Sequence, residues 1–498
     1  RMDKSQAIGL LTRGATRKEK RRVEHRESLA SPSKLPAVPS TSGDEDWAHF
    51  RRLLRISVKG GDIPKPITSF NWLDSIGMQK DAVNSIKEGI EKSEYKEPTA
   101  VQMQAIPVME KGRDCIVGAP TGSGKTAAFG IPALLRVRKK MAWKSCRTTK
   151  GPAILILSPT RELSSQTSSY LCRFNQGSSI KIVSLTAVSD SRLLSDELLE
   201  SDIVVAPPLR LSKLVESSTS SGDTCSYFSE VELVIVDEAD KLFGLGFQEQ
   251  VDILLAALPP KVQKAVFSAT IPETVQSLCS SIMSDPISIF VGERGGASTT
   301  VDQELKYCGS EQGKLVELRK MLLSGLHTPA VLFVQSKDRA IQLFKEIGYD
   351  KYKVDVFHSD LSQADRENTL RRLRIGEIWM VIATDVLARG VDVKGIRLVI
   401  NYDFPQSTTS YVHRIGRTGR AGQHGSAITF FSDEDVPLLR SIANIMHQSG
   451  CKVPQWILSL KKAPRAELTR LSSRPPKRRR ISTSVSSKKR SSNKANVI

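Results

Sequence analysis

The sequence predicts an α/β fold with two tandem domains, each built around a mostly parallel sheet. Short apolar runs alternate with amphipathic stretches from about Phe70 onward, and the alternation starts again after residue 299. Strand-length runs separated by helical patterns are typical of βαβ units. The chain has 498 residues, of which 39% are hydrophobic, and one hydrophobic core stops growing at ~250–300 residues. More than one domain is therefore expected.

The expected strands of the first domain, residues 66–293, lie at 114–117, 153–157, 180–185, 203–205, 233–236 and 265–267. The expected strands of the second domain, residues 299–455, lie at 330–334, 353–357, 380–383, 398–401 and 427–431. A stretch rich in Gly, Ser and Thr at 295–300 separates the two series, which predicts a short linker at 294–298.

The net charge of +20 is concentrated at the two ends of the chain. Residues 1–60 hold 14 Lys and Arg against 7 Asp and Glu, and residues 456–498 hold 13 against 1. Because blocks of like charge repel, we expect residues 1–65 and 456–498 to be largely disordered basic arms that contact nucleic acid. A solubilising tail without a specific partner is the alternative.

Composition also limits the class of protein. No apolar run approaches the ~18–20 residues that span a bilayer, so no membrane partner is expected. Seven cysteines without a C-x-x-C pair predict free thiols in a reducing compartment, and the charged N-terminus carries no secretory pattern. These features predict a soluble intracellular protein.

A Gly-rich loop at 119–126 is the most specific local signal, because it lies between an apolar run and a helical one. Backbone N–H groups of such a loop, with a helix N-terminus, can enclose phosphate oxygens. Lys125 would neutralise the β- and γ-phosphates, and the Thr126 hydroxyl would bind Mg²⁺. A tight connection without a ligand is the alternative. The predicted nucleotide-binding residues here are Ala119, Pro120, Thr121, Gly122, Ser123, Gly124, Lys125 and Thr126.

Two acids follow the apolar run at 233–236 directly. Ligands of open α/β sheets bind at the carboxyl ends of strands, so Asp237 and Glu238 should lie beside the loop. We expect Asp237 to hold Mg²⁺ and Glu238 to deprotonate an attacking water. An acidic helix cap is the alternative for either residue alone.

Hydrolysis of a phosphoanhydride also needs fixed cations around the γ-phosphoryl group. Arg417 and Arg420, within the segment 413–420 of the second domain, are the candidates. If they enter the site from that domain, hydrolysis proceeds only when the two domains close. A basic nucleic-acid patch is the alternative for this segment.

In this order, these residues resemble the DEAD-box family of ATP-dependent RNA helicases, and the resemblance covers residues 70–431. It implies two tandem RecA-like domains and ATP with Mg²⁺ as cofactors. The segment 99–102 looks like the family's Q motif, in which Gln102 would read the adenine edge and Phe70, or Trp72 in its place, would pack on the base. Asp392 matches an acid that approaches the nucleotide.

The same resemblance implies residues for coupling and for RNA. Coupling between the nucleotide and strand separation is implied for Asp240, Ser268, Thr270 and His413. RNA contacts are implied for Thr160, Arg161, Arg210, Gln363, Arg366, Thr384 and Asp385. Two features depart from the family pattern: Pro207 replaces a threonine that contacts RNA, and a Gly-Gly pair is missing near 184–187.

Three stretches, at 303–311, 401–405 and 437–444, resemble the nucleolar helicases of small-subunit ribosome assembly. That branch implies a nuclear, nucleolar protein with a monomeric core that binds pre-rRNA and ribosome-assembly proteins. Basic clusters at 475–480 and 488–490 are typical of nuclear-import signals. Two other functions stay open at this point. One is an ATP-gated RNA clamp or scaffold that does not unwind productively. The other is a P-loop kinase or GTPase, which lacks a guanine-reading N-K-x-D segment and leaves the second domain unexplained.

Overall fold

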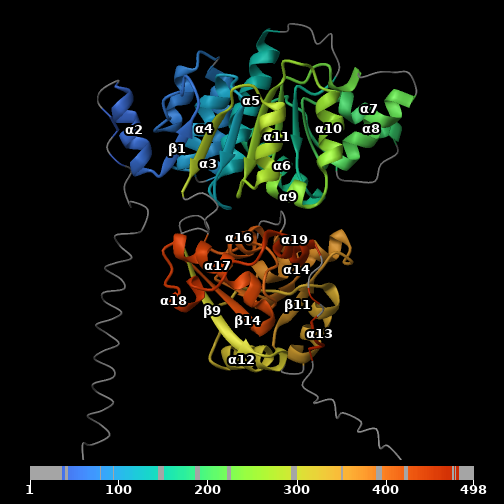
Figure 1. The fold of residues 1–498 in the computed structure, drawn as a ribbon. Helices are drawn as coiled ribbons and strands as arrows, with labels where there is room; N and C mark the ends of the chain where they lie inside the picture. The colour runs from blue at the N-terminus through green and yellow to red at the C-terminus, as the bar shows by residue number, and fades with distance from the viewer. Residues whose placement is uncertain are drawn as a thin grey trace, which may run out of the picture.

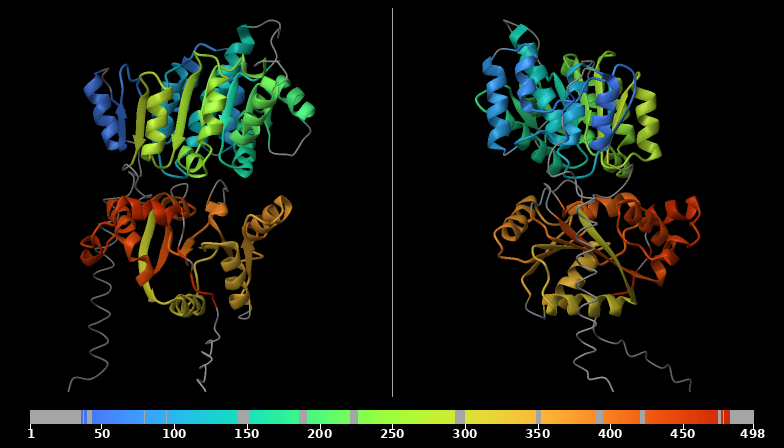
Figure 2. Two further views of the ribbon diagram at one scale, coloured as in Figure 1. Left: turned by 45° about the vertical axis from the view of Figure 1, so that its right-hand side comes forward. Right: turned by 90° about the vertical axis from the view of Figure 1, so that its left-hand side faces the viewer.

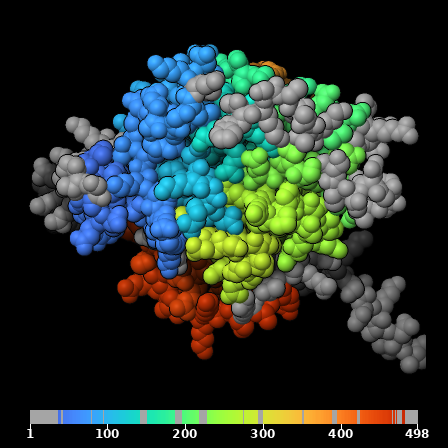
Figure 3. All heavy atoms as spheres, turned by 90° about the horizontal axis from the view of Figure 1, so that it is seen from above, coloured from blue at the N-terminus to red at the C-terminus, as the bar shows by residue number. Residues whose placement is uncertain are grey.

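The computed structural model of the chain describes residues 43–481 together with 36, 38 and 39, apart from gaps at 79, 94, 144–150, 186–190, 221–225, 293–299, 349–351, 389–394, 420–423, 474–475 and 477. Its described residues form two α/β domains, one above the other in Figure 1. Seen from above, most of the coloured surface belongs to the first domain, and the second domain appears mainly along one edge (Figure 3). None of the described helices is long and apolar enough to cross a membrane.

The first domain is built on a sheet that contains eight strands among the described residues, in the order β1-β8-β2-β7-β6-β3-β5-β4. All neighbouring strands are parallel except β1 and β8. The strands are β1 (Ile56–Lys59), β2 (Cys115–Gly118), β3 (Ile154–Leu157), β4 (Ile182–Ser184), β5 (Ile203–Ala206), β6 (Leu233–Val236), β7 (Gln263–Ser268) and β8 (Ile287–Val291). The sequence predicted all of them except β1 and β8.

Helices cover both faces of this sheet (Figures 1 and 2). Because successive strand residues point to opposite faces, Ile154 and Ile156 join one core cluster while Leu155 and Leu157 join the other. This explains why the strands are apolar throughout. The helices are α2 (Asp44–Leu53), α3 (Lys80–Lys92), α4 (Ala100–Glu110), α5 (Lys125–Trp143), α6 (Arg161–Phe174), α7 (Ser191–Glu200), α8 (Pro208–Ser220), α9 (Ala239–Gly244), α10 (Gln248–Ala256) and α11 (Glu273–Ile282), with the short 3-10 helices η1 (Phe70–Ser75) and η2 (Ser226–Phe228).

The first domain begins earlier than the predicted boundary at residue 66. Strand β1 pairs antiparallel with β8, with Ile56 opposite Val291, and Phe50 of α2 is buried. Arg51 of α2 donates from Nε to Gln104 Oε1 at 2.8 Å. The prediction of a disordered arm to residue 65 is therefore wrong for residues 44–65, because a few apolar side chains anchor this charged stretch to the sheet edge.

The second domain contains a sheet of six parallel strands in the described part of the chain, in the order β11-β12-β10-β13-β14-β9. Its strands are β9 (Val301–Gly309), β10 (Ala330–Phe333), β11 (Val354–Phe357), β12 (Met380–Ala383), β13 (Leu398–Asn401) and β14 (Gly425–Ser432). The tandem α/β architecture predicted from the sequence is confirmed. Strand β9 was not predicted, because only its first residues alternate between buried and exposed side chains.

Helices of the second domain also pack on both faces of its sheet. They are α12 (Glu311–Leu323), α13 (Lys337–Gly348), α14 (Gln363–Arg374), α15 (Asp385–Ala388), α16 (Thr408–Ile415), α17 (Val436–Gln448), α18 (Gln455–Leu458) and α19 (Arg465–Ser473), with the 3-10 helix η3 (Asp433–Asp435). Helix α13 lies in one core cluster, through Ala340 and Leu343, whereas α16 lies in the other, through Tyr411 and Val412.

The composition predicted a disordered tail from residue 456, but described residues beyond this position pack against the second domain. Ile457 and Ile481 are each 2% exposed, and Leu468 and Leu471 of α19 pack against the second-domain core. The charge count did not reveal these apolar residues, because they are spaced widely along a basic stretch. The rest of the predicted tail, residues 482–498, lies outside the described residues, as do residues 1–35 of the predicted arm and the predicted linker.

Candidate nucleotide and RNA site

The phosphate-binding loop lies between the end of β2 and the start of α5. Gly122 and Gly124 have φ angles of 80° and 93°, a left-handed region that glycine adopts without a steric penalty. A Cβ atom at Gly124 would lie 2.5 Å from Gln102 Nε2. The loop therefore needs glycine both for its turn and for its close approach to α4.

Lys125, the first residue of α5, points back into this loop. Its Nζ donates to the Ala119 carbonyl at 2.5 Å and to the Pro120 carbonyl at 3.1 Å, and the residue is 8% exposed. The ammonium group thus sits at a helix N-terminus, where backbone N–H groups also favour anions. This arrangement can receive phosphate oxygens.

Gln102 is buried in α4 and its side-chain amide is used within the first domain. Its Nε2 donates to the Gly124 carbonyl at 3.1 Å, and its Oε1 accepts from the Thr99 amide at 3.0 Å. It therefore links the predicted base-reading segment to the phosphate-binding loop. Phe70 belongs to the hydrophobic core, and Trp72 is only partly buried against it.

The two acids after β6 have different environments. Burial and the neighbouring Glu238 charge raise the pKa of Asp237 to about 7, although Lys125 and Lys241 oppose this. Glu238 has a left-handed backbone, with φ at 50°. Burial alone would raise the pKa of Glu238, but Lys241, His413 and Arg417 together lower it. Glu238 therefore stays ionised, as a general base requires.

Lys241 is a site residue that the sequence analysis missed. Its ammonium forms a buried ion pair with the Glu238 carboxylate, three residues earlier on the chain. Burial lowers the pKa of Lys241 to about 8, although Glu238 opposes the shift. The i,i+3 spacing from Glu238 to a lysine was visible in the sequence, but burial of the lysine was not.

Asp240 joins the two domains. Its carboxylate accepts from the Thr270 amide at 2.9 Å and from the Thr270 hydroxyl at 2.6 Å, and its backbone amide donates to Ser268 Oγ at 3.1 Å. The same carboxylate lies 3.0 Å from His413 Nε2 of the second domain. All four residues predicted for coupling therefore form one hydrogen-bonded network across the domain interface.

The protonation states of this network follow from burial. Burial, together with the nearby Lys241 charge, lowers the pKa of His413, so the neutral ring donates from Nε2 to Asp240 at neutral pH. Burial would raise the pKa of Asp240, but its bonds to His413 and Thr270 outweigh that effect and lower the pKa.

A second interdomain contact lies at the phosphate-binding loop itself. The Thr121 hydroxyl donates to the Gly416 carbonyl at 3.3 Å. Arg417, the next residue, is buried, and its Nε donates to the His413 carbonyl at 3.3 Å. Its charge acts on both Glu238 and Lys241. The structure therefore brings one predicted arginine to the acidic motif, while Arg420 and Asp392 lie outside the described residues.

Two arginines of the first domain converge on a candidate RNA surface. Arg161 is exposed at the first position of α6, whose N-cap is Thr160. Burial and the nearby Arg161 charge lower the pKa of Arg210 in α8, which places the two cations close together. Paired cations of this kind would be stabilised by a phosphate. Pro207 contributes only its carbonyl, which accepts from the Arg210 amide.

The candidate RNA residues of the second domain have different partners. Arg366 of α14 forms an ion pair across the interface with Glu162, next to Arg161. Gln363 is exposed and donates to Glu367 at 2.8 Å, and the Thr384 amide donates to Phe357.

Asp385, which was predicted to contact RNA, has a carboxylate that holds α16. It accepts from Arg414 Nε at 2.6 Å and also from the Ser410 hydroxyl. The sequence analysis missed both Arg414 and Glu162, because nothing local marks either residue as an interaction partner.

Comparisons with known proteins agree with this geometry. The chain matches the family model of DEAD/DEAH box helicases over residues 99–278 and that of the helicase conserved C-terminal domain over residues 313–422. It is 42% identical to the probable ATP-dependent RNA helicase DDX52 of Mus musculus, over 87% of this chain and 71% of the mouse protein. It is 41% identical to the ATP-dependent RNA helicase ROK1 of Yarrowia lipolytica, over 95% of this chain and 86% of the yeast protein.

The fold is also similar to that of S. cerevisiae Dbp5 bound to RNA and ADP BeF3, with a TM-score of 0.64 and 23% identity, covering 82% of this chain and 98% of the Dbp5 chain. The chain therefore belongs to the DEAD-box helicases, and the kinase or GTPase alternative is removed. Within that family it groups with the DDX52 and ROK1 helicases, and it is an ATP-dependent RNA helicase.

Proposed function

We propose that this helicase works through a bipartite ATP pocket, which is completed only when the two domains close on RNA. The observation that carries the proposal is the contact between Asp240 and His413 across the interface, with Thr121 and Gly416 in contact at the phosphate-binding loop. Each domain supplies part of the site. ATP and RNA then favour the same closed arrangement, which is reciprocal coupling typically worth ~1–3 kcal/mol.

The proposed roles of the residues follow from their positions. Lys125 neutralises the β- and γ-phosphates, and Arg417 and Arg420 stabilise the charge that develops on the transferred phosphoryl group. Glu238 accepts a proton from the attacking water, and its lowered pKa keeps the carboxylate ionised. Asp240 couples the nucleotide site to the second domain through its hydrogen bonds with Thr270 and His413.

The residues at the loop fit a magnesium ion that arrives with the nucleotide. Asp237 and Thr126 offer the hard oxygen atoms that Mg²⁺ prefers. The raised pKa of Asp237 reflects a buried carboxylate that lacks sufficient positive charge nearby. A bound divalent cation would supply that charge and would neutralise the phosphates. We therefore assign Thr126 and Asp237 as the ligands.

RNA would lie over the surface where the two domains meet. Arg161, Arg210 and Arg366 are the cations there, with Thr160, Gln363 and Thr384 as further polar contacts. Contacts to phosphates carry little sequence information, so the core should bind RNA with weak sequence preference. Domain closure on one strand would then bend it and separate a few base pairs.

The substrate we propose is pre-rRNA of the small ribosomal subunit, within pre-ribosomal particles of the nucleolus. The branch-like stretches at 303–311 and 401–405 support this, as does the similarity to ROK1 and DDX52 over most of the chain. Crosslinking the protein to cellular RNA and sequencing the fragments tests it. Enrichment of small-subunit precursor sequences is expected, and their absence would remove this substrate.

An ATP-gated clamp without productive unwinding is the competing function. A strand-displacement assay on a short RNA duplex separates the two. The wild type should release the strand with ATP, whereas the Glu238→Gln variant should bind ATP and RNA but displace the strand at least ~100-fold more slowly. Equal displacement with ATP and with a non-hydrolysable analogue would favour the clamp.

A further inference from the structure

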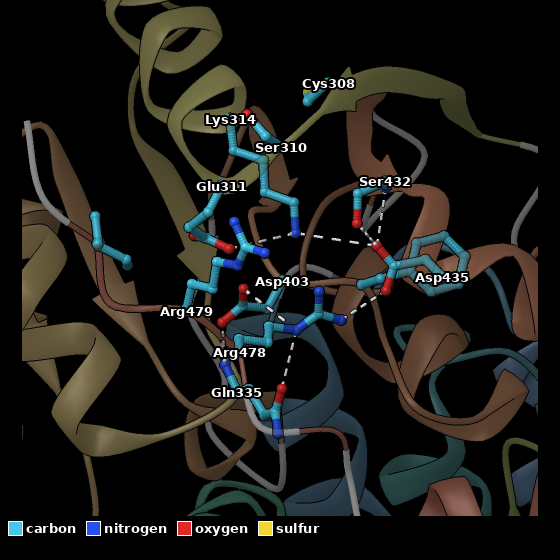
Figure 4. Close-up of polar contacts among 12 residues, drawn as sticks. Cys308, Ser310, Glu311, Lys314, Gln335, Asp403, Ser432, Asp435, Arg478 and Arg479 are labelled. Atoms are coloured by element: carbon cyan, nitrogen blue, oxygen red, sulfur yellow. Dashed lines mark hydrogen bonds and ion pairs between the residues drawn. The ribbon is translucent and has the colours of Figure 1, made fainter. Parts of the chain in front are cut away.

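Four neighbouring strands of the second domain end in one polar cluster (Figure 4). Gln335 follows β10, Asp403 follows β13, Asp435 follows β14, and Glu311 follows β9. These strands are adjacent in the sheet, in the order β10-β13-β14-β9. Their polar residues therefore meet at its carboxyl edge, the edge where open α/β sheets bind ligands.

The strand order identifies the place within this edge where a ligand crevice is expected. After β10 the chain runs through α13 toward β11, and after β13 it runs through α16 toward β14 on the other side. Helices α13 and α16 lie in the core clusters on opposite faces of the sheet. The connections from β10 and β13 thus diverge, which opens a crevice between the two strand ends.

The side chain of Arg478, a residue that follows α19, lies among these strand ends. Its side chain is 2% exposed, although its backbone is partly accessible. Its guanidinium donates to Asp435 Oδ1 at 2.7 Å and to Gln335 Oε1 at 3.0 Å, and its Nε lies 3.7 Å from Asp403 Oδ1. Burial would lower the pKa of Arg478, but Asp403 and Asp435 outweigh it and raise this pKa.

The backbone on both sides of Arg478 is held as well. Gln335 Nε2 donates to the Pro476 carbonyl at 3.1 Å, and Arg339 donates to the Arg479 carbonyl at 2.7 Å. The Ile481 amide donates to Gln342 Oε1 at 3.1 Å, and the Ile481 side chain lies in the core that contains α13. A short peptide is therefore bound by a charged anchor, an apolar anchor and main-chain hydrogen bonds.

The charges of the cluster balance only when Arg478 is present. The acids Glu311, Asp403 and Asp435 face the bases Lys314, Arg339 and Arg478, and both Asp403 and Asp435 are at most 2% exposed. Arg339 is already bound to Asp403 and Glu311. Lys314 Nζ lies 4.0 Å from Asp435, too far for a hydrogen bond. Without Arg478, Asp435 would be a buried carboxylate without a bonded cation.

We propose that the carboxyl edge of the second domain is an arginine-binding site whose ligand is the chain's own residues 476 and 478–481, which we name the arginine latch. The latch pairs Arg478 with the buried acids of the second domain. This residue therefore does not contact RNA phosphates, in contrast to what is expected of the other bases of the tail. A peptide whose carbonyls and guanidinium are already bonded cannot lie along a second polyanionic surface at the same time.

The test compares two variants of the full-length protein that remove the same charge. Arg478→Gln removes the buried guanidinium, and Arg480→Gln, the control, removes an exposed one two residues later. Breaking a buried pair strongly destabilises a domain, so Arg478→Gln should lower the melting temperature of the second domain by about 6–12 °C. Arg480→Gln should lower it by less than about 1 °C. Equal shifts in the two variants would overturn the proposal.

A double-mutant comparison shows whether Asp435 is the partner. Adding Asp435→Asn to Arg478→Gln removes the stranded carboxylate, so the double variant should melt no lower than Arg478→Gln alone. A purely additive fall would contradict the assigned pair. Trypsin gives an independent measurement, because cleavage after Arg478 should be at least about tenfold slower in the wild type than in the Asp435→Asn variant.

The salt dependence of RNA binding distinguishes a latch residue from a basic residue that contacts RNA phosphates. If Arg478 neutralised an RNA phosphate, Arg478→Gln would reduce the slope of log affinity against log salt by about 0.7–0.9. The latch predicts an unchanged slope, measured at a temperature where both proteins are folded. A reduced slope together with an unchanged melting temperature would make Arg478 an RNA tether and would overturn the proposal.

Discussion

The two domains use the same edge of the same architecture in opposite ways. At the carboxyl edge of the first sheet, Lys125 is bonded to loop carbonyls and Asp237 has a pKa raised by burial. At the carboxyl edge of the second sheet, Asp403 and Asp435 are bonded to Arg339 and Arg478. At the first edge the buried Asp237 keeps a raised pKa, whereas at the second edge the acids Asp403 and Asp435 are bonded to arginines of the chain itself.

Backbone strain shows the same difference. Glu238 adopts a left-handed conformation in the first domain, which costs a non-glycine residue roughly 1–3 kcal/mol. The latch residues Arg478, Arg479 and Arg480 are not among the described residues with positive φ. Strain of this kind can position a reactive group, and the latch residues bind without it.

The largest expected effect separates activity from stability. Glu238→Gln should lower RNA-stimulated ATP hydrolysis by about 10²–10⁴-fold, because it removes the general base. Arg478→Gln should instead lower the melting temperature and retain hydrolysis below it. Phosphate release and thermal unfolding measure the two quantities, and Glu249→Gln, an exposed change on α10, is the control. If Arg478→Gln abolished hydrolysis in the folded protein, the contrast between the edges would fail.

Gly416→Ala should disturb closure. An added Cβ would lie 1.8 Å from Thr121 Oγ1 and 3.1 Å from Thr121 Cβ of the first domain, and 3.0 Å from the Val412 carbonyl of its own domain, so the two domains could not approach as closely as they do here. We expect hydrolysis to fall at least about tenfold, with ATP binding to the first domain retained. Gly348→Ala is the matched control, because nothing lies within 4 Å of a Cβ there. Wild-type turnover by Gly416→Ala would mean that this contact is not part of the active state.

Acidification should open the interface. Burial in the closed arrangement lowers the pKa of His413, whereas an exposed imidazole titrates near 6.5. Closure is therefore favoured above that pH and is lost as the pH falls below it, by at most about tenfold per pH unit. The groups facing the ring are Asp240, Lys241 and Glu238.

Fluorescence energy transfer between labels on the two domains measures this closure. His413→Gln should flatten the pH dependence between 5.5 and 6.5, and His424→Gln, which changes an exposed histidine, should not. A pH dependence that survives in His413→Gln would assign the titration to another group.

The smallest expected effect concerns the ion pair between Glu162 and Arg366, which is partly exposed. Pairs of this kind contribute about 0–1 kcal/mol, so breaking it should change ATP-induced closure by about fivefold or less. A double-mutant cycle of Glu162→Gln and Arg366→Gln, measured without RNA, isolates the pair. Neutralising Lys337 and Asp360, a pair within the second domain, is the control and should leave closure unchanged.

Much of the first domain's site could be predicted from the sequence, because its geometry is local. The phosphate-binding loop needs glycines at fixed positions between a strand and a helix, and Asp237 and Glu238 follow a strand end directly. The burial of Lys241 and the ion pair of Glu162 could not be predicted. Both depend on which helix surfaces pack together, and the apolar periodicity of a single segment does not predict such contacts.

By itself, the sequence determined the α/β alternation, the glycine-rich loop between β2 and α5, and the acids at the end of β6, because backbone conformation and apolar spacing act over a few residues. The tertiary structure decided which charged groups are paired and buried. Arg478 bonds to Asp435 and Gln335, which lie 43 and 143 residues away along the chain. In the sequence Arg478 is one cation of a basic tail, and only packing removes it from water.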